Sequence, residues 1–302
     1  MIHLLNKIIV FFMPIVPKFV VRFFSKRYIA GPELKDGVSV VKELMSNGMC
    51  ATMDILGEDI NSKEQAGETT REYFQVLEAI RDENLDANIS VKLTALGLKI
   101  DKEFCYEQTR SIVQKAKELN NFVRIDMEDH TCTDDTIAIY RRIKKEFDNV
   151  GIVLQSYLRR TLDDVKQLVA EHGHFRICKG IYIEPRKVAW KDPEIVNWNF
   201  IKATEMMLKG NCYTGIATHD EKLVWHGMRI VQELNLNKNQ YEFQMLLGVD
   251  ESLRQIILDA GHRMRVYVPF GKQWYAYSTR RLKENPSMVG YILKRIFGFG
   301  PK

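Results

Sequence analysis

The sequence predicts an α/β fold, a (β/α)8 TIM-type barrel with an N-terminal helical arm. Eight short apolar runs rich in β-branched residues lie between Met49 and Pro269, and a segment of helical length follows each of them. Strands that alternate with helices favour parallel βαβ units. Eight such units within roughly 250 residues match a closed barrel. An open doubly wound sheet is the alternative, because periodicity alone does not prove closure.

Each apolar run has the length of a strand. The runs are apolar almost throughout, which is typical of parallel strands with both faces covered. The expected strands are Met49–Ile55, Ile89–Ala95, Phe122–Met127, Gly151–Tyr157, Phe175–Tyr182, Gly215–His219, Tyr241–Leu246 and Met264–Pro269.

The segments between the runs are longer and amphipathic, as expected of helices that cover a sheet. The chain has neither a glycine-rich GxGxxG loop nor a P-loop, so any nucleotide must be held in another way. No low-complexity linker divides it. The expected helices are Lys63–Arg81, Asp101–Asn120, Asp134–Phe147, Thr161–His172, Glu194–Lys209, Glu221–Leu234, Ser252–Ala260 and Trp274–Ile296.

The first 30 residues differ in charge from the rest. They hold five basic residues and no acidic ones. Because the net charge of the whole chain is +5, the remainder is close to neutral. A nucleic-acid binder would show a broad basic stripe interleaved with exposed aromatic residues, and the sequence has none between its two ends. We therefore expect no nucleic-acid partner. The five basic residues are Lys7, Lys18, Arg22, Lys26 and Arg27.

The segment Ile2–Phe24 is apolar but is interrupted by Pro14, Pro17 and three basic residues. A spanning helix needs about 20 nearly uncharged residues, so an anchor lying on an anionic membrane surface fits better. A packing arm and a secretory signal are the alternatives. We expect residues 1–40 to form this arm and residues 41–302 to form the barrel.

The five cysteines are scattered and show no CxxC spacing. This pattern favours a reducing cytoplasm and argues against a zinc site built from thiolates. We expect a cytoplasmic protein that is peripheral on the inner face of the cytoplasmic membrane.

A carboxylate site is predicted near the C-terminus. The last apolar run ends at Pro269, and the helix expected after it carries Tyr277, Arg280, Arg281 and Glu284 within two turns. Residues three and four apart share a helix face, so these side chains converge beyond the strand end. Two adjacent guanidinium groups offer planar forks for a small carboxylate. A solvated basic helix is the alternative.

Charged residues interrupt runs that are otherwise apolar, namely Lys92, Arg124, Asp126, Arg176 and Lys179. Burying a charge is costly unless it is paired or bound to a ligand. In a parallel barrel, active sites lie at the carboxyl ends of the strands. We expect these residues to form the polar floor of one pocket. The excess of cations predicts an anionic occupant such as a pyrophosphate.

The stretch Asp126-Met-Glu-Asp-His130, together with His219, is open to a second interpretation. Its acidic density would suit a hard metal cation. On a strand, however, Asp126 and Glu128 point to the same side, whereas Asp129 and His130 fall in the following loop. We therefore expect no metal.

The joint order of seven motifs resembles the flavin-dependent proline dehydrogenases of the compact, monofunctional bacterial type. The resemblance covers nearly the whole chain from about Gly48 to Pro286, and each motif alone would be weak. The motifs are Ser90-Val-Lys-Leu-Thr94, Arg124-Ile-Asp-Met-Glu-Asp129, Leu154-Gln-Ser-Tyr157, Arg176-Ile-Cys-Lys-Gly-Ile-Tyr182, Ala217-Thr-His-Asp220, Glu242-Phe-Gln244 and the segment from Tyr267 to Glu284.

The resemblance implies a distorted (β/α)8 barrel that binds FAD. It also implies oxidation of L-proline to Δ1-pyrroline-5-carboxylate, the first step of proline catabolism to glutamate. Hydride would pass to flavin N5, and the electrons would pass on to a membrane quinone.

By motif position, the resemblance also implies a role for each residue. The apolar run Ile181-Tyr182-Ile183 departs from the family pattern near the flavin. Residues at the reactive end of the flavin would be Asp126 and Arg176. Residues around the substrate would be Lys92, Leu246, Tyr267, Tyr277, Arg280 and Arg281. Residues that hold FAD would be Met127, Gln155, Arg176, Lys179, Gly180, Ile181, Thr218, His219 and Glu284.

Two other classes of function fit the same residues. One is a barrel enzyme that acts on a related cyclic amine such as hydroxyproline, or a metal-dependent aldolase that uses the acidic cluster around Asp126. The other is a non-catalytic, membrane-associated barrel, whose pocket charges would satisfy one another and which would purify without colour.

Overall fold

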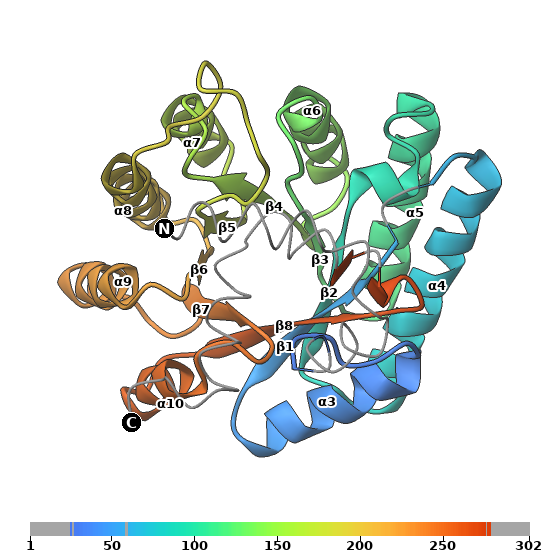
Figure 1. Ribbon diagram of the computed structural model, residues 1–302, viewed down its shortest axis with the longest axis horizontal. Coiled ribbons are helices and arrows are strands. Elements are labelled where there is room, and N and C mark those ends of the chain that lie inside the picture. Colours follow the sequence, from blue (N-terminus) through green and yellow to red (C-terminus); the bar gives the residue numbers. More distant parts are fainter. Residues whose placement is uncertain (1–24, 26, 58–59, 276, 279–302) are drawn as a thin grey trace, which may run out of the picture.

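A computed structural model describes residues 25, 27–57, 60–275 and 277–278, and the statements below concern these. Eight parallel strands form a closed barrel in sequence order, which confirms the predicted fold (Figure 1). The last strand pairs with the first, with Val266 opposite Ala51. The strands are β1 (Cys50–Ile55), β2 (Ala87–Val91), β3 (Val123–Ile125), β4 (Val150–Gln155), β5 (Phe175–Cys178), β6 (Thr214–Ala217), β7 (Tyr241–Leu246) and β8 (Met264–Phe270).

The helices surround the barrel (Figure 1). Within the described residues, no helix is long and apolar enough to span a bilayer. Of the last expected helix, Trp274, Tyr275, Tyr277 and Ser278 are helical, and the remainder lies outside the described residues. The helices are α3 (Leu34–Ser46), α4 (Lys63–Asp82), α5 (Lys102–Glu118), α6 (Thr133–Lys144), α7 (Thr161–Ala170), α8 (Pro193–Lys209), α9 (Glu221–Glu233) and α10 (Glu251–Asp259), with a 3-10 turn, η2 (Leu93–Leu96).

Helix α3 was not predicted from the sequence. It lies outside β1 and β8 (Figure 1), and an added Cβ at its Gly37 would lie 2.9 Å from Met53 and 3.2 Å from Phe270. The Asp36 carboxylate accepts a hydrogen bond from Glu33 N at the start of this helix. The division expected between residues 40 and 41 falls inside α3.

Aspartate side chains cap the start of four of the helices described above. Asp101, Asp192, Asp220 and Asp250 each accept backbone N–H groups in the first turn of α5, α8, α9 and α10. These contacts satisfy N–H groups that a helix cannot pair internally. These contacts determine where the four helices start, and therefore how long the loops before them are.

Several strands end earlier than the apolar runs predicted. The chain leaves β2 after Val91 and turns through η2, although the apolar run extends to Ala95. Gly97 ends this turn with φ +98°, a left-handed conformation suited to glycine. The residues just beyond the strands, including Lys92, Asp126 and Lys179, therefore lie in loops at the carboxyl edge.

Polar side chains occupy the interior of the barrel. The Arg176 guanidinium on β5 reaches Ser90 on β2, and these two strands are not neighbours in the sheet. Because side chains alternate along a strand, Ile89 and Val91 lie on the other face of β2, where they belong to the apolar core. The main apolar core therefore lies between the strands and the helices.

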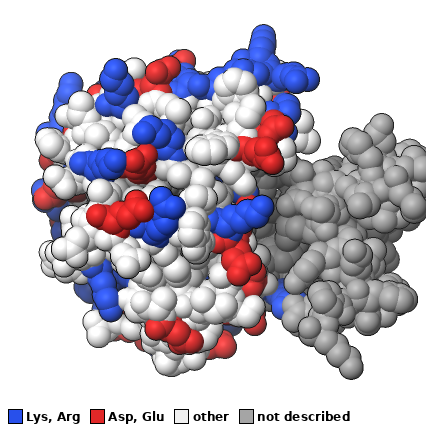
Figure 2. Space-filling model, turned by 90° about the vertical axis from the view of Figure 1, so that its left-hand side faces the viewer, with Lys and Arg blue, Asp and Glu red and all other residues white. Residues whose placement is uncertain are grey.

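The outer face over α8 and α9 carries charges of both signs. Figure 2 shows acidic and basic side chains interspersed on the described part of this face. Glu205 pairs with Lys202 and Lys209, and Arg229 pairs with Glu233. This face therefore carries no extended field of one sign.

Gly151 in β4 offers a test of packing inside the barrel. An added Cβ would lie 2.3 Å from Arg124 Nη1 and 2.6 Å from the His174 carbonyl oxygen. We expect Gly151→Ala to lower the free energy of unfolding by about 1–3 kcal/mol, as overpacked interiors do. Urea denaturation measures this change.

Gly67→Ala in α4 is the matched control, since the nearest side-chain atom would lie 3.7 Å from the new Cβ. It should leave stability unchanged or raise it by up to about 1 kcal/mol, because alanine favours helix. Equal effects of the two substitutions would contradict the packing account.

Candidate active site

The carboxylate of Asp126 is the centre of a buried polar cluster. Its Oδ1 accepts hydrogen bonds from Arg176 Nη1 at 2.7 Å and Ser90 Oγ at 3.0 Å. Its Oδ2 accepts a hydrogen bond from the Tyr267 hydroxyl at 2.7 Å. These donors come from β2, β5 and β8, so the closed barrel brings them to one point beyond the end of β3.

A second ion pair lies beside the first. Lys92 Nζ donates to both carboxylate oxygens of Asp54 at 2.7 and 2.8 Å, and Asp54 is fully buried in β1. The same nitrogen lies 3.3 Å from the Tyr267 hydroxyl and 3.9 Å from Asp126 Oδ2. Two cations and two carboxylates therefore balance one another around Tyr267.

Tyr267 acts in this cluster as a hydrogen-bond donor. Burial raises the pKa of its phenol well above the usual value, and the charges of Asp126 and Asp54 raise this pKa further. The Arg176 guanidinium carbon lies 5.2 Å from the ring centroid. A raised pKa keeps the phenol protonated, which fits its role as a hydrogen-bond donor to Asp126.

A third set of contacts lies deeper in the barrel. Arg176 Nε donates to Gln244 Oε1 at 2.6 Å, and Glu242 Oε1 accepts from Gln244 Nε2 at 2.6 Å and Arg265 Nε at 2.8 Å. Burial alone would raise the pKa of Glu242, but the charge and hydrogen bond of Arg265 outweigh it and lower this pKa to about 2. Glu242 is therefore ionised at neutral pH.

Sequence reasoning missed Asp54 and Ser90. Asp54 carried a signal, because it stands inside the apolar run that forms β1 and resembles the other charged residues in this respect. Ser90 stood in the motif Ser90-Val-Lys-Leu-Thr94, but it has no charge that would have singled it out as a site residue. Asp54 meets Lys92 from the neighbouring strand β2, whereas Ser90 meets Arg176 from β5 across the barrel.

Not every charged residue of the predicted floor joins the cluster. Arg124 donates from Nη1 to the His174 carbonyl at 2.7 Å, and its Nη2 lies 2.9 Å from His174 Nδ1. Lys179 pairs with Asp220 at 2.7 Å. The expectation of one shared floor is therefore wrong for Arg124, because its long side chain turns toward the loop before β5.

Several residues assigned to the cofactor lie at the ends of β3 to β7. Gln155 Nε2 donates to the Met127 carbonyl at 3.2 Å, and the buried Gln155 Oε1 has no hydrogen-bond partner in the described part of the chain. His219 Nε2 accepts from Leu246 N at 2.9 Å. Gly180 has φ +104°, and an added Cβ would lie 2.3 Å from the Tyr157 ring.

Three further residues predicted to hold the cofactor lie at the same edge. Thr218 Oγ1 accepts from Asp220 N at 3.1 Å, Met127 is buried and Ile181 is partly buried. Tyr277 is buried in a small apolar cluster with Tyr28, Ile29 and Leu56. Arg280, Arg281 and Glu284 lie outside the described residues.

The acidic stretch after β3 is divided among separate partners. Glu128 accepts from Thr94 N at 3.0 Å, Asp129 pairs with Lys99 at 3.2 Å, and His130 pairs with Glu184. Within the described residues, no three histidine, cysteine or acidic side chains are grouped as metal ligands. Asp126 is instead held by Arg176 and Tyr267.

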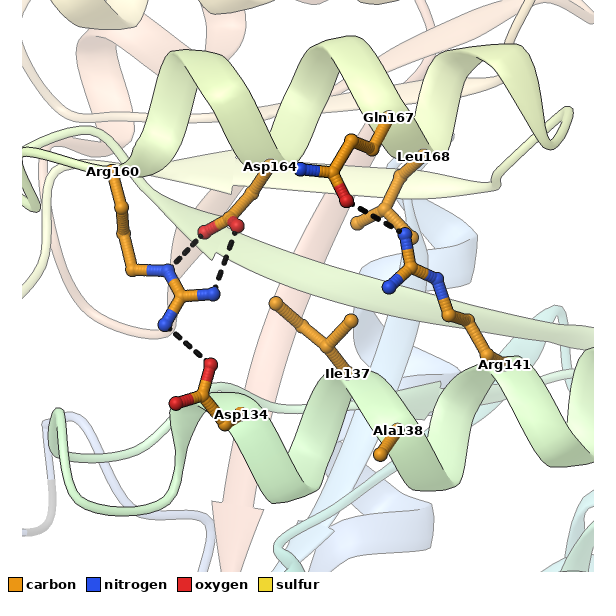
Figure 3. Close-up of a pocket in the computed structure, with 8 residues that line it drawn as sticks. All are labelled: Asp134, Ile137, Ala138, Arg141, Arg160, Asp164, Gln167 and Leu168. Carbon is orange, nitrogen blue, oxygen red and sulfur yellow. Dashed lines mark hydrogen bonds and ion pairs between the residues drawn. The ribbon is translucent and has the colours of Figure 1, made fainter.

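A cavity of about 240 Å³ between α6 and α7 lies on the helical outer layer, away from this cluster (Figure 3). Arg160 bonds to Asp134 and Asp164 across it, and Arg141 bonds to Gln167. Its charged groups are paired with one another. We therefore place the candidate site at the carboxyl ends of the strands.

Fold and cluster together define a (β/α)8-barrel protein with a charged site at the carboxyl edge of its strands. The family model for proline dehydrogenase matches residues 38–292. The chain belongs to the proline dehydrogenase family.

Curated relatives match over most of their length. Proline dehydrogenase 1 of Bacillus subtilis subsp. natto is 36% identical over 275 residues, which cover 91% of each chain. Proline dehydrogenase of Deinococcus radiodurans is 34% identical over 275 residues, 89% of each chain. These matches confirm the family that the motifs indicated.

A larger solved protein contains the same barrel. Proline utilization A (PutA) from Bdellovibrio bacteriovorus, in a crystal structure inactivated by N-propargylglycine, superposes with a TM-score of 0.80 at 26% identity. The match covers 86% of this chain and 32% of that one. This chain therefore spans about a third of that protein.

Glu242 predicts a defined pH dependence of stability. Its folded pKa of about 2 lies below the usual 4.5, so its contribution is fully present above about pH 4.5 and is lost as the pH falls toward 2. Glu242→Gln should make the fall in unfolding free energy over this range shallower. Urea denaturation at several pH values measures the slope.

Glu43→Gln, at an exposed position on α3, is the control for that experiment. It should leave the slope close to that of the unsubstituted protein. An unchanged slope for Glu242→Gln would mean that this carboxylate is not held as described.

Proposed function

We propose that the chain catalyses the flavin-dependent oxidation of L-proline to Δ1-pyrroline-5-carboxylate, the first step of proline catabolism to glutamate. The observation that carries this proposal is the Asp126, Arg176, Tyr267 and Lys92 cluster at the barrel mouth of a chain in the proline dehydrogenase family. Hydrogen bonds among residues of different strands hold its charges in place, as electrostatic preorganisation requires.

The residues around the cluster fit FAD as the cofactor. The buried Gln155 Oε1 offers an acceptor without a partner in the described residues, and the left-handed backbone at Gly180 allows close approach to a ligand. FAD, when bound, supplies the hydride acceptor. The residues that would hold it are Met127, Gln155, Arg176, Lys179, Gly180, Ile181, Thr218, His219 and Glu284.

On this proposal, the substrate is positioned by its carboxylate. Arg280, Arg281 and Lys92 would bind that group, and Asp54 holds the Lys92 ammonium group in place. Tyr267, Tyr277 and Leu246 would pack around the ring. Fixing one end of a small substrate determines where its reactive carbon lies, which favours reaction through orientation.

Arg176 and Asp126 would act at the reactive end of the flavin. The positive charge of Arg176 would stabilise negative charge that develops on the reduced cofactor. Asp126 holds that charge in place through its 2.7 Å hydrogen bond. The hydroxyl of Tyr267 completes this arrangement as a donor to Asp126.

We further propose a membrane quinone as the electron acceptor and an anionic membrane surface as the docking partner. Residues 1–30 support this, because they combine an apolar segment with five basic residues and no acidic ones. Such segments bind the membrane interface through apolar burial and charge together. Docking would bring the enzyme to a quinone dissolved in the bilayer.

Turnover with L-proline tests the proposal directly. The purified protein should reduce a soluble artificial acceptor when L-proline is added, with Δ1-pyrroline-5-carboxylate as the product. Denaturation should release free FAD. A fully flavin-loaded protein that leaves L-proline unchanged would contradict the activity, and flavin retained by the precipitated chain would contradict non-covalent binding.

Arg281→Met tests the carboxylate site. Loss of one charged, bidentate contact should cost on the order of 2–5 kcal/mol in transition-state binding, so kcat/KM for L-proline should nearly vanish. Steady-state kinetics measure the ratio to the unsubstituted enzyme.

Arg142→Met is the matched control, because Arg142 pairs with Glu103 on the outer surface of the barrel. Its kcat/KM should stay near that of the unsubstituted enzyme. A loss below about tenfold in Arg281→Met, roughly 1.4 kcal/mol, would place the carboxylate elsewhere.

A further inference from the structure

Arg176 is held from two opposite sides. Asp126 and Ser90 accept from its two terminal nitrogens at 2.7 and 3.1 Å, and Gln244 accepts from its Nε at 2.6 Å. The acceptors come from β2, the end of β3 and β7, and all lie in the barrel interior. Contacts at both edges of a planar guanidinium fix its plane as well as its position.

Gln244 can adopt only one amide orientation in this setting. Its Oε1 faces Arg176 Nε, which can only donate a hydrogen bond. Its Nε2 faces the Glu242 carboxylate, which in its ionised form can only accept one. Turning the amide over would set a donor against a donor and an acceptor against an acceptor. The charge of Glu242 therefore determines which end of the amide faces Arg176.

Two arginines of the last strand region hold the Glu242 carboxylate in place. Arg265 Nε donates to Glu242 Oε1 at 2.8 Å, and Arg265 Nη1 donates to the Ala51 carbonyl of β1. Arg263 Nε lies 3.4 Å from Glu242 Oε2. The side chains of Glu242, Gln244, Arg265 and Arg176 are nearly inaccessible to solvent, so water competes little for these bonds.

The sheet also leaves space for Gln244. An added Cβ at Gly215, on neighbouring β6, would lie 2.4 Å from Gln244 Nε2 and 3.0 Å from its amide carbon. Any larger residue at position 215 would displace the amide from its place between Glu242 and Arg176.

We propose that Gln244, oriented by Glu242, is the positioning residue that sets the plane of Arg176 at the reaction site. The inference rests on the proposed function for Arg176. Gln244 acts through Arg176, and its substitution should impair the chemical step more than substrate binding. It should also lower the midpoint potential of the bound flavin, because a displaced cation stabilises the reduced form less.

Gln244→Met is the first test variant, since methionine has a similar length and forms neither bond. We expect kcat to fall by about tenfold or more with little change in KM, the pattern of a contact that matters mainly in the transition state. The flavin potential should fall in the same variant. Thermal unfolding and FAD content are measured alongside.

Gln244→Glu is the conservative variant. In its protonated form the new carboxyl group can donate to Glu242 and accept from Arg176, which reproduces both bonds of the amide. Activity should therefore be retained at acidic pH and fall as rising pH ionises the new group against Glu242. In the unsubstituted enzyme, the pH profile of activity should not show this additional fall with rising pH.

Thr52→Val is the control for general disturbance of the barrel. Thr52 is fully buried and donates to Asn88 Oδ1 at 2.6 Å, and no described contact joins it to Arg176. Its substitution should lower stability while kcat and flavin potential stay near those of the unsubstituted enzyme.

Solvent exchange of the Arg176 Nε–H, followed by NMR in flavin-free protein, separates this inference from the proposed function. The Nε–H should be protected in the unsubstituted protein and exchange faster in Gln244→Met. Protection without proline oxidation would overturn the proposed function alone. Unchanged kcat, potential and Nε–H protection in Gln244→Met would overturn the positioning role.

Discussion

The buried carboxylate of Asp126 is the contact on which the rest of the site depends. It joins the Arg176 guanidinium, the Ser90 hydroxyl and the Tyr267 hydroxyl, which belong to three other strands. Removing one partner from a buried ion pair leaves an uncompensated charge, which is strongly destabilising. The same contact therefore links closure of the barrel to the placement of the charges at its mouth.

The interior of this barrel is specified by polar contacts as well as by apolar packing. The apolar core lies between strands and helices, while hydrogen bonds inside the barrel run from Arg265 through Glu242 and Gln244 to Arg176. Buried polar groups of this kind are costly unless satisfied, and once satisfied they favour one arrangement over others. The cations at the mouth, Arg176 and Lys92, are thereby held in place beside Asp126 and Asp54.

The sequence alone predicted the fold because eight apolar runs alternate with amphipathic segments. It also singled out Lys92, Asp126 and Arg176, since a charge inside an apolar run is conspicuous. It misplaced Arg124, because the position of a residue on a strand does not determine where a long side chain turns.

Other features depend on contacts that spacing cannot reveal. Helix α3 was missed because the boundary expected after residue 40 divided its residues between the arm and the barrel, although its Gly37 packs against β1 and β8. Asp54 acquires its role from Lys92 at the end of the neighbouring strand β2, and Ser90 acquires its role from Arg176 on β5 across the barrel. The early end of β2 depends on the turn η2, whose residues are as apolar as those of a strand.

The central claim is that the cluster around Asp126 is where L-proline delivers electrons to a bound flavin. Anaerobic addition of L-proline to the flavin-loaded protein, followed by visible absorption, tests it most directly. The account predicts loss of the oxidised flavin spectrum in the unsubstituted protein and much slower loss in Asp126→Asn that still holds its flavin. A flavin spectrum unchanged by L-proline, or equal rates in the two proteins, would contradict it.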